Sequence, residues 1–454
     1  MKARPLIPPS RRTSIPTLLA VLASVAGVAA CAPAAPTRPN VVLISIDSLR
    51  ADHLGIYGYP KATSPAIDGF AGEASTFEHA VSVSSWTLPA HMSMLSCVPP
   101  EVHGVVDDGL AVSKRLPLLA DILRQAGYDT LGVVSAPYLS SVFGFASGFR
   151  EYDDQTVSFP SNRASHRGET SSRVHKRVLE LLDDATAPFF LFIHYWDVHY
   201  DYTPPAPFDT LFDQDYTGDL SGARFEGNAR IVADMPARDL EHLVALYDGE
   251  IAYTDSYIGA LMSELKERDL WQDALVILTA DHGEEFFEHG AKGHRKNLHA
   301  ETVNVPLIIK SPRGADAVRE TMLVGTIDIM PTVLRTAGLP VPRHCGGRPI
   351  LPTDDLEPRP YFSALRGRFK TMRDGSFKLF RDARSGQEML YETSRDPAES
   401  LDVARGYPKT MRTMRAELQR WLRAQKETER GVRRGEITYD EELARQLRAL
   451  GYIQ

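Results

Sequence analysis

Four short runs of apolar residues have the length of β-strands and cover residues 40–46, 132–134, 189–193 and 274–280. Apolar runs without alternating polar positions are typical of strands buried on both faces of a parallel sheet. Segments with helical character lie between them, and the segment over 243–268 spaces its apolar residues by three and four. Strands that alternate with helices predict an α/β fold with a doubly wound, mostly parallel sheet.

The pattern changes after residue 345. Short candidate strands lie within 367–380 and 388–391, and a charged helix is expected over 408–429. We therefore predict a main domain over residues 40–345 and a smaller α+β C-terminal subdomain over residues 346–454.

Polar residues follow several of the predicted strands. Asp47 follows the first run, His194 follows the third with His199 close behind, and Asp281 and His282 follow the last. Doubly wound sheets bind ligands beyond the carboxyl ends of their strands. The sequence therefore predicts a functional site at this edge of the sheet.

The N-terminal segment has the features of an export signal. Basic residues precede an apolar run over 15–30 that is too short to span a bilayer. Val28-Ala29-Ala30-Cys31 resembles a bacterial lipobox, so we expect residues 1–30 to be removed and Cys31 to carry lipid. Residues 31–39 would then tether the protein to the membrane of a bacterial cell envelope, on its periplasmic or extracellular face. The alternative is an ordinary signal peptide cut at a nearby alanine.

Composition narrows the range of partners. The chain has 51 basic and 59 acidic residues, and this excess of negative charge argues against nucleic acid. Cys97 and Cys345 are the only cysteines after Cys31, so the sequence allows one disulfide within the domain, between these two.

Asp281 and His282 place a carboxylate and an imidazole side by side at the end of a buried strand. Together with Asp47 they could bind a divalent cation, and the donor types suit Zn, Mn, Mg or Ca. The alternative is structural, with Asp281 capping a following helix and His282 making a local hydrogen bond.

Thr87 lies just before the apolar helical stretch 92–95, where backbone amides favour an anionic group. A hydroxyl that binds a metal near a helix N-terminus loses its proton more readily, so Thr87 could be a nucleophile toward phosphorus or sulfur. The alternative is that Thr87 only caps the helix.

These motifs occur in the order and spacing of one family. From end to end the chain resembles the sulfatase family of the alkaline phosphatase superfamily, and this resemblance implies an alkaline-phosphatase-like fold. The matching segments are 40–47, 87–91, 103–105, 119–130, 196–202, 247–251, 281–284, 305–309, 328–332 and 390–397.

The departures from the family pattern bear on the chemistry. Sulfatases of this type oxidise a signature Cys or Ser to formylglycine and carry an Arg four residues later, but here Thr87 and His91 hold these positions. Ser48 replaces the second acidic residue after the first strand. Oxidation of threonine would give a ketone, so the sequence argues against formylglycine. The pattern instead resembles relatives with a threonine nucleophile.

By this resemblance, one divalent metal ion would be held by Asp47, Thr87, Asp281 and His282, and His91 would contact the substrate. His199 matches a histidine that binds the ester or protonates its leaving group, although it could instead be a loop histidine bonded to neighbouring aspartates. His294 lies where relatives place a contact to the leaving group, and the adjacent cations at 292 and 295 compete for this role.

Three functions are compatible with this sequence. The first is a metal-dependent hydrolase or transferase that acts on phosphate or sulfate esters through Thr87. The second is a sulfatase that works without formylglycine. The third is an inactive, envelope-anchored protein that binds a glycan or a lipid. The substrate would be an ester of a small molecule, a lipid or a glycan.

Overall fold

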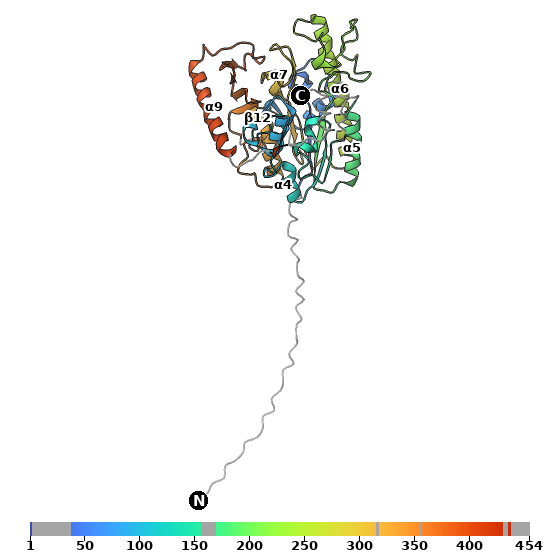
Figure 1. Ribbon diagram of the computed structural model, residues 1–454. Coiled ribbons are helices and arrows are strands. Elements are labelled where there is room, and N and C mark those ends of the chain that lie inside the picture. The colour runs from blue at the N-terminus through green and yellow to red at the C-terminus, as the bar shows by residue number, and fades with distance from the viewer. Residues whose placement is uncertain (2–37, 156–168, 315–316, 354–355, 430–434, 437–454) are drawn as a thin grey trace. The chain divides into compact units, whose positions relative to one another are not determined.

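The computed structural model describes Met1 and residues 38–155, 169–314, 317–353, 356–429 and 435–436 (Figure 1). The expected signal peptide, Cys31 and nearly all of the tether lie outside the described residues. Among the residues that are described, no helix has both the length and the apolar character needed to cross a membrane.

The central sheet has nine strands. Five of them are parallel and follow the order β7, β1, β6, β4, β5, with bounds Leu275–Ala280, Val41–Ile46, Phe189–Tyr195, Asp129–Val133 and Glu151–Asp153. β1, β6 and β7 are buried along their whole length, as their apolar runs predict. The predicted α/β fold with a mostly parallel sheet is confirmed.

The other edge of the sheet is mixed in direction. β11 (Leu307–Lys310) is antiparallel to β7 and to β2 (Ser75–Val81). β10 (Asn304–Val305) and β12 (Val318–Gly325) both pair with β2. The apolar pattern does not reveal β12, because the first half of this strand is largely exposed.

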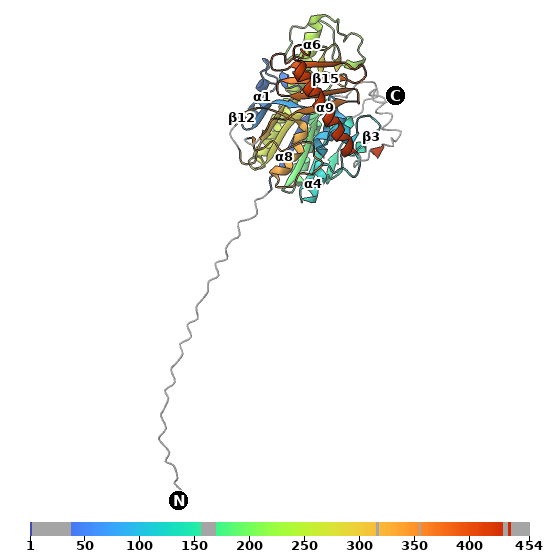
Figure 2. The same ribbon diagram turned by 90° about the vertical axis from the view of Figure 1, so that its left-hand side faces the viewer.

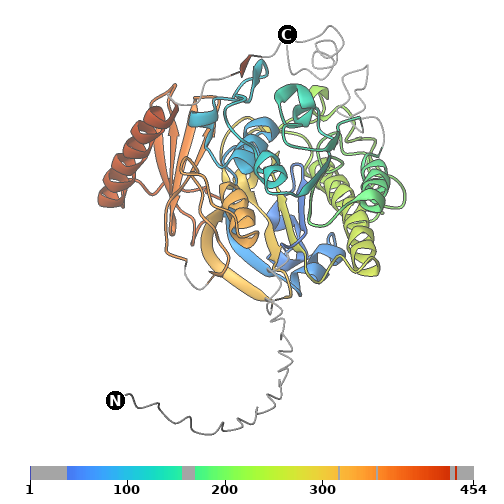
Figure 3. The same ribbon diagram turned by 90° about the horizontal axis from the view of Figure 1, so that it is seen from below.

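Helices cover both faces of the parallel strands, and Figure 3 shows the two groups on opposite sides. One group contains α1 (Pro65–Ala71), α5 (Ser171–Asp184) and α6 (Ala237–Glu267); the other contains α2 (Thr87–Ser96), α4 (Leu119–Gln125) and α8 (Ile329–Thr336). Two single-turn helices, α3 (Pro100–His103) and α7 (Ala300–Val303), lie in loops. The helix predicted over 243–268 is α6, which begins earlier, at Ala237.

A second, antiparallel sheet lies in the C-terminal part of the chain (Figure 2). Its strands follow the order β13, β14, β15, β16, with bounds Tyr361–Leu365, Phe369–Asp374, Phe377–Asp382 and Glu388–Glu392. α9 (Pro408–Glu429) covers it, with Met411, Met414 and Leu418 packed on Met372, Leu379 and Leu390. An α+β C-terminal subdomain is therefore present, while its predicted boundary at residue 346 stays a prediction.

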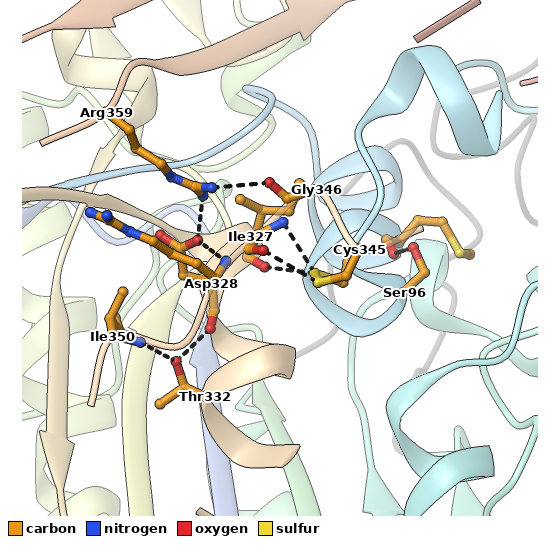
Figure 4. Close-up of a disulfide and its surroundings, with 12 residues drawn as sticks. Ser96, Ile327, Asp328, Thr332, Cys345, Gly346, Ile350 and Arg359 are labelled. Carbon is orange, nitrogen blue, oxygen red and sulfur yellow. Dashed lines mark hydrogen bonds and ion pairs between the residues drawn. A yellow bond between two sulfur atoms is a disulfide. The ribbon is translucent and has the colours of Figure 1, made fainter. Parts of the chain in front are cut away.

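A disulfide joins Cys97 to Cys345, with 4.8 Å between their Cα atoms (Figure 4). Cys97 follows the last residue of α2, so the bridge ties the end of this helix to the segment that precedes the second sheet. Nearby, the carboxylate of Asp328 accepts hydrogen bonds from the backbone of Arg348 and the guanidinium of Arg359. The disulfide is the one bridge that the sequence allows.

Candidate metal-binding active site

Strand register brings the predicted metal ligands together. Ile46 of β1 pairs with Ala280 of β7, so Asp47 and Asp281 leave neighbouring parallel strands at the same level. Both carboxylates are completely buried. The predicted site at the carboxyl edge of the sheet is therefore present as a cluster of side chains.

Thr87 is the first residue of α2, and the helix cap is the preceding residue, Trp86. The Thr87 hydroxyl lies 3.3 Å from Oδ2 of Asp47 and 3.2 Å from Nε2 of His282. Trp86, the cap residue, makes no side-chain capping bond, and the hydrogen bonds of the Thr87 hydroxyl run to Asp47 and His282. The capping alternative is therefore wrong, and the hydroxyl is turned toward the candidate metal ligands.

The segment after β7 holds Asp281 and His282 in fixed orientations. Oδ1 of Asp281 accepts hydrogen bonds from the backbone amides of Ser48, at 3.2 Å, and His282, at 2.9 Å. Nδ1 of His282 lies 2.9 Å from the carbonyl oxygen of Gly283 and donates to it, which leaves Nε2 facing Thr87. No helix follows Asp281, so the alternative that it caps one is also wrong.

The electrostatics of the cluster fit a divalent cation. Burial raises the pKa of Asp47 to about 6, and burial together with the charge of Asp47 raises the pKa of Asp281. A cation between the carboxylates would reverse both effects. Oδ2 of Asp281 is buried without a hydrogen-bond partner, and ligand atoms of Asp47, Asp281 and His282 all lie within 4.8 Å of one another.

His91 lies behind the nucleophile and is completely buried. Its Nδ1 donates to the carbonyl oxygen of Thr87 at 3.0 Å, and its Nε2 lies 2.9 Å from the hydroxyl of Ser45. Burial lowers the pKa of His91 to about 3, so the ring is neutral. The structure thus gives His91 contacts that hold the backbone of Thr87, while its predicted contact with substrate stays a prediction.

His294 lies next to His282, and His199 lies next to His294, farther from the carboxylates. The ring centre of His294 lies 4.4 Å from that of His282 and 4.9 Å from that of His199. His199 stacks on Trp196, and Nδ1 of His294 lies 2.9 Å from a carboxylate oxygen of Glu284. Both histidines are therefore beside the cluster, where the resemblance places groups that contact the leaving group.

The cations that compete with His294 have other partners. The ammonium of Lys292 donates to backbone carbonyls of Phe225 and Ile231, both at 2.8 Å. The guanidinium of Arg295 lies 4.4 Å from the ring centre of Trp86 and donates to the hydroxyl of Tyr138. These contacts favour His294 over Lys292 and Arg295 as the group next to His282.

The sequence predicts His194 at this edge of the sheet, but in a structural role and not as a residue of the site. Its Nε2 lies 3.3 Å from Oδ2 of Asp47, and the side chain is completely buried. A histidine inside a buried apolar run gives no signal of its own. Its position beside Ser45 of β1 could have been inferred only from the register of β1 and β6.

The structure also accounts for the acidic residues near His199. Asp197 accepts hydrogen bonds from the backbone amides of Thr170 and Ser171, and Asp201 accepts one from Phe225. Both carboxylates thus hold backbone segments in place. The number of metal ions stays a prediction.

A comparison with protein-family models assigns the chain to a family. The model named Sulfatase matches residues 39–339, which is most of the chain. The chain belongs to the sulfatase family. Members of this family use a divalent metal, and the cluster of Asp47, Asp281 and His282 is the corresponding candidate site. The prediction of an ester hydrolase of this family is confirmed at the level of the family.

Relatives and solved structures agree with this sulfatase-family assignment. The multifunctional alkaline phosphatase superfamily protein PehA of Trinickia caryophylli is 26% identical over 394 residues, 69% of this chain and 76% of that protein. Arylsulfatase K of Bos taurus is 27% identical over 189 residues, which are 38% of this chain and 35% of that protein. The chain therefore spans about a third of that relative's length.

The fold agrees with the same assignment. The crystal structure of the phosphonate monoester hydrolase of Agrobacterium radiobacter superposes with a TM-score of 0.72 at 21% identity. The match covers 86% of this chain and 96% of that structure. The predicted alkaline-phosphatase-like fold is confirmed.

Proposed function

We propose that this sulfatase-family protein hydrolyses or transfers phosphate or sulfate esters, with Thr87 as a metal-activated nucleophile. The observation that carries the proposal is the direction of the Thr87 hydroxyl, which faces Asp47 and His282 instead of its own helix. The names of two similar proteins support the reaction class, since one is a multifunctional alkaline phosphatase superfamily protein and the other a phosphonate monoester hydrolase.

The geometry suggests how the chain's own groups would act. A cation held by Asp47, Asp281 and His282 would supply positive charge that lowers the pKa of the Thr87 hydroxyl. Oγ1 of Thr87, 3.3 Å from Asp47 Oδ2, would lose its proton to solvent and form a bond to phosphorus or sulfur while the bond to the leaving oxygen breaks. His199 would protonate the leaving oxygen, and His294, whose pKa burial holds well below 6.5, would contact it as a neutral ring. Water or an acceptor alcohol then releases the group from Thr87.

Two positions favour phosphate-type esters over sulfate. The signature Arg of the family is His91 here, and this neutral ring is hydrogen-bonded behind the nucleophile. By the resemblance, the family also has a Lys at the end of its second strand, which would fall near Ser135, whose hydroxyl donates to the carbonyl of His194. Because these two sulfate-binding cations are replaced by neutral groups, charge stabilisation of the ester would depend more on the metal.

A sulfatase that works without formylglycine is the second candidate. The similarity to arylsulfatase K favours it, and it would use the same Thr87 and the same cation. An inactive binding protein fits less well. It would have no chemical need for two completely buried carboxylates and an imidazole around a hydroxyl.

The decisive experiment follows modification of Thr87. We expect a panel of phosphate monoesters, diesters, phosphonates and sulfate esters to be turned over with added Zn or Mn, and Thr87 to be modified in acid-quenched samples analysed by mass spectrometry. Thr87→Ala should lose turnover by at least about 1,000-fold, whereas Thr87→Ser should keep part of it. The matched control is Thr332→Ala, a buried threonine of α8. Unchanged turnover in Thr87→Ala would refute the proposal.

We also propose that Cys31 carries a lipid that anchors the protein to a bacterial envelope membrane. The support is the sequence Val28-Ala29-Ala30-Cys31 after an apolar run. The full-length protein should incorporate labelled palmitate and fractionate with membranes, and Cys31→Ser should do neither. Labelling that is unchanged in Cys31→Ser would contradict this.

A further inference from the structure

His194 is buried without the hydrogen bonds that an imidazole normally makes. It is the sixth residue of β6, and its exposed fraction is 0%. Neither Nδ1 nor Nε2 has a hydrogen-bond partner. Burying a polar group in this way costs about 1–3 kcal/mol, so such a residue needs an explanation.

The unpaired atoms lie at the carboxylate cluster. Nε2 of His194 is 3.3 Å from Oδ2 of Asp47, and a ring nitrogen lies within 4.8 Å of a carboxylate oxygen of Asp281. Oδ2 of Asp281 also lacks a hydrogen-bond partner. His194 of β6 and Asp281 after β7, the strands on either side of β1, therefore leave ligand-type atoms unsatisfied at the same place.

The spacing of these atoms fits coordination of one ion. Neighbouring ligands about 2.1 Å from a four- or five-coordinate metal lie about 3.0–3.6 Å from one another. The separations here are 3.3 Å from His194 Nε2 to Asp47 Oδ2, 3.3 Å from Asp47 Oδ2 to Thr87 Oγ1, and 3.2 Å from Thr87 Oγ1 to His282 Nε2. His282 Nε2 is in turn 3.4 Å from Asp281 Oδ2.

The neighbouring His91 differs from His194, because both of its ring nitrogens have hydrogen-bond partners. Its Nδ1 and Nε2 are occupied by the Thr87 carbonyl and the Ser45 hydroxyl. Although His91 also lies near Asp281, at 3.5 Å from Oδ2, it could bind a metal only by giving up one of these bonds. His194 has no such bond to lose.

We propose that His194 is a further ligand of the cation held by Asp47, Asp281 and His282. The site then has two imidazoles and two carboxylates, so it selects Zn²⁺, Mn²⁺ or a similar transition ion over Ca²⁺ and Mg²⁺, which prefer oxygen ligands. This inference shares its cation with the proposed function, but it does not depend on which ester is cleaved or on Thr87 as nucleophile.

The first test counts the ligands of the bound ion directly. The full chain is loaded with Zn²⁺, and X-ray absorption spectroscopy counts the imidazoles bound to the ion. We expect two imidazoles in the wild-type protein and one in His194→Gln. A single imidazole in the wild-type protein, or no bound ion, would overturn the proposal even if esters are turned over.

The second test measures affinity. Competition titration should show Zn²⁺ binding at least about 10-fold weaker in His194→Gln and His194→Ala, since even loss of a group that only supports a ligand weakens binding by about 10–100-fold. His242→Gln is the control, because His242 pairs with Asp213 and stacks on Tyr216. Unchanged affinity in a variant whose circular dichroism is native would refute the role of His194.

Thr87→Ala separates this inference from the proposed function. If Thr87→Ala keeps two imidazoles on the ion and has no activity, both proposals stand. If it keeps full activity while two imidazoles are bound, only the nucleophile is wrong. If the wild-type protein turns over esters with one imidazole on its ion, only the ligand role of His194 is wrong.

Discussion

At the scale of single residues, Gly283 determines how closely the segment after Asp281 approaches α7. A Cβ at this position would lie 2.1 Å from the carbonyl oxygen of Glu301, which is backbone and cannot move aside. The amide of Gly283 also donates to the carbonyl of Thr302 at 3.0 Å, and its own carbonyl accepts from His282. The orientation of His282 therefore depends on the absence of a side chain at the next residue.

We expect Gly283→Ala to displace His282, to lower the free energy of unfolding by about 1–3 kcal/mol and to lower ester turnover and metal affinity. Thermal unfolding and metal titration measure these effects. Gly69→Ala is the control, because nothing lies within 4 Å of a Cβ there and alanine favours the helix α1. Native metal affinity in Gly283→Ala would contradict this account of His282.

The residues of the site differ in how far sequence could reveal them. Asp47, Asp281 and His282 follow apolar runs directly, so their place at the carboxyl edge of the sheet is predictable. The direction of the Thr87 hydroxyl is not, because capping and catalysis place threonine at the same end of a helix. The role of His194 could not be predicted, because it depends on Asp47, which follows the neighbouring strand β1.

At the scale of elements, a polar network links the second sheet to the segment that carries His294. Lys378 of β15 pairs with Glu399 at 2.7 Å, and both are almost completely buried. Glu399 also lies 3.2 Å from Nδ1 of His299, whose ring stacks on that of His289. His289 in turn pairs with Glu301 of α7 at 2.9 Å. The two sheets are thus connected through charged groups as well as apolar contacts.

This network predicts a dependence of stability on pH. Burial alone would lower the pKa of His289, but the hydrogen bond and charge of Glu301 raise it to about 9 from 6.5. The protonated histidine therefore stabilises the fold fully below pH 6.5, and this contribution disappears as pH rises toward 9. With solvent screening it is on the order of 1 kcal/mol.

Urea unfolding at a series of pH values measures the effect, and nuclear magnetic resonance gives the pKa of His289 directly. In Glu301→Gln, the decrease in the free energy of unfolding between pH 6.5 and 9 that is due to His289 should be absent. A His289 pKa near 6.5 in the wild-type protein would contradict the pairing.

The elements themselves were predictable to different degrees. Strands β1, β6 and β7 are apolar and buried throughout, so the sequence reveals them without knowledge of neighbours. α9 has the predicted bounds, because its charged sequence keeps an apolar side toward the second sheet. β12 could not be predicted, since it becomes a strand by pairing with β2 and buries only its last residues.

At the scale of the whole molecule, the Cys97–Cys345 disulfide covalently joins two parts of the chain that are far apart in sequence. It spans 248 residues and joins the end of α2, whose first residue is Thr87, to the region before the second sheet. The bridge therefore limits how far the unfolded chain can expand.

Cys97→Ala combined with Cys345→Ala should lower the free energy of unfolding by about 2–5 kcal/mol. Ester turnover measured well below the new melting temperature should be retained, because Cys97 lies at the opposite end of α2 from Thr87. Calorimetry with and without a reducing agent makes the comparison, and the variant should not respond to reduction. Equal melting temperatures of the oxidised wild-type protein and the variant would contradict a stabilising role.

The candidate ligands are contributed by segments that are distant in sequence and adjacent only in the folded sheet, at positions 47, 194, 281 and 282. An unfolded chain cannot present them together, so the ion acts as a thermodynamic partner of folding. At 100 times its dissociation constant, an ion that binds only the native state adds about 2.7 kcal/mol to stability. The supply of metal in the protein's compartment would thus regulate its abundance as well as its activity.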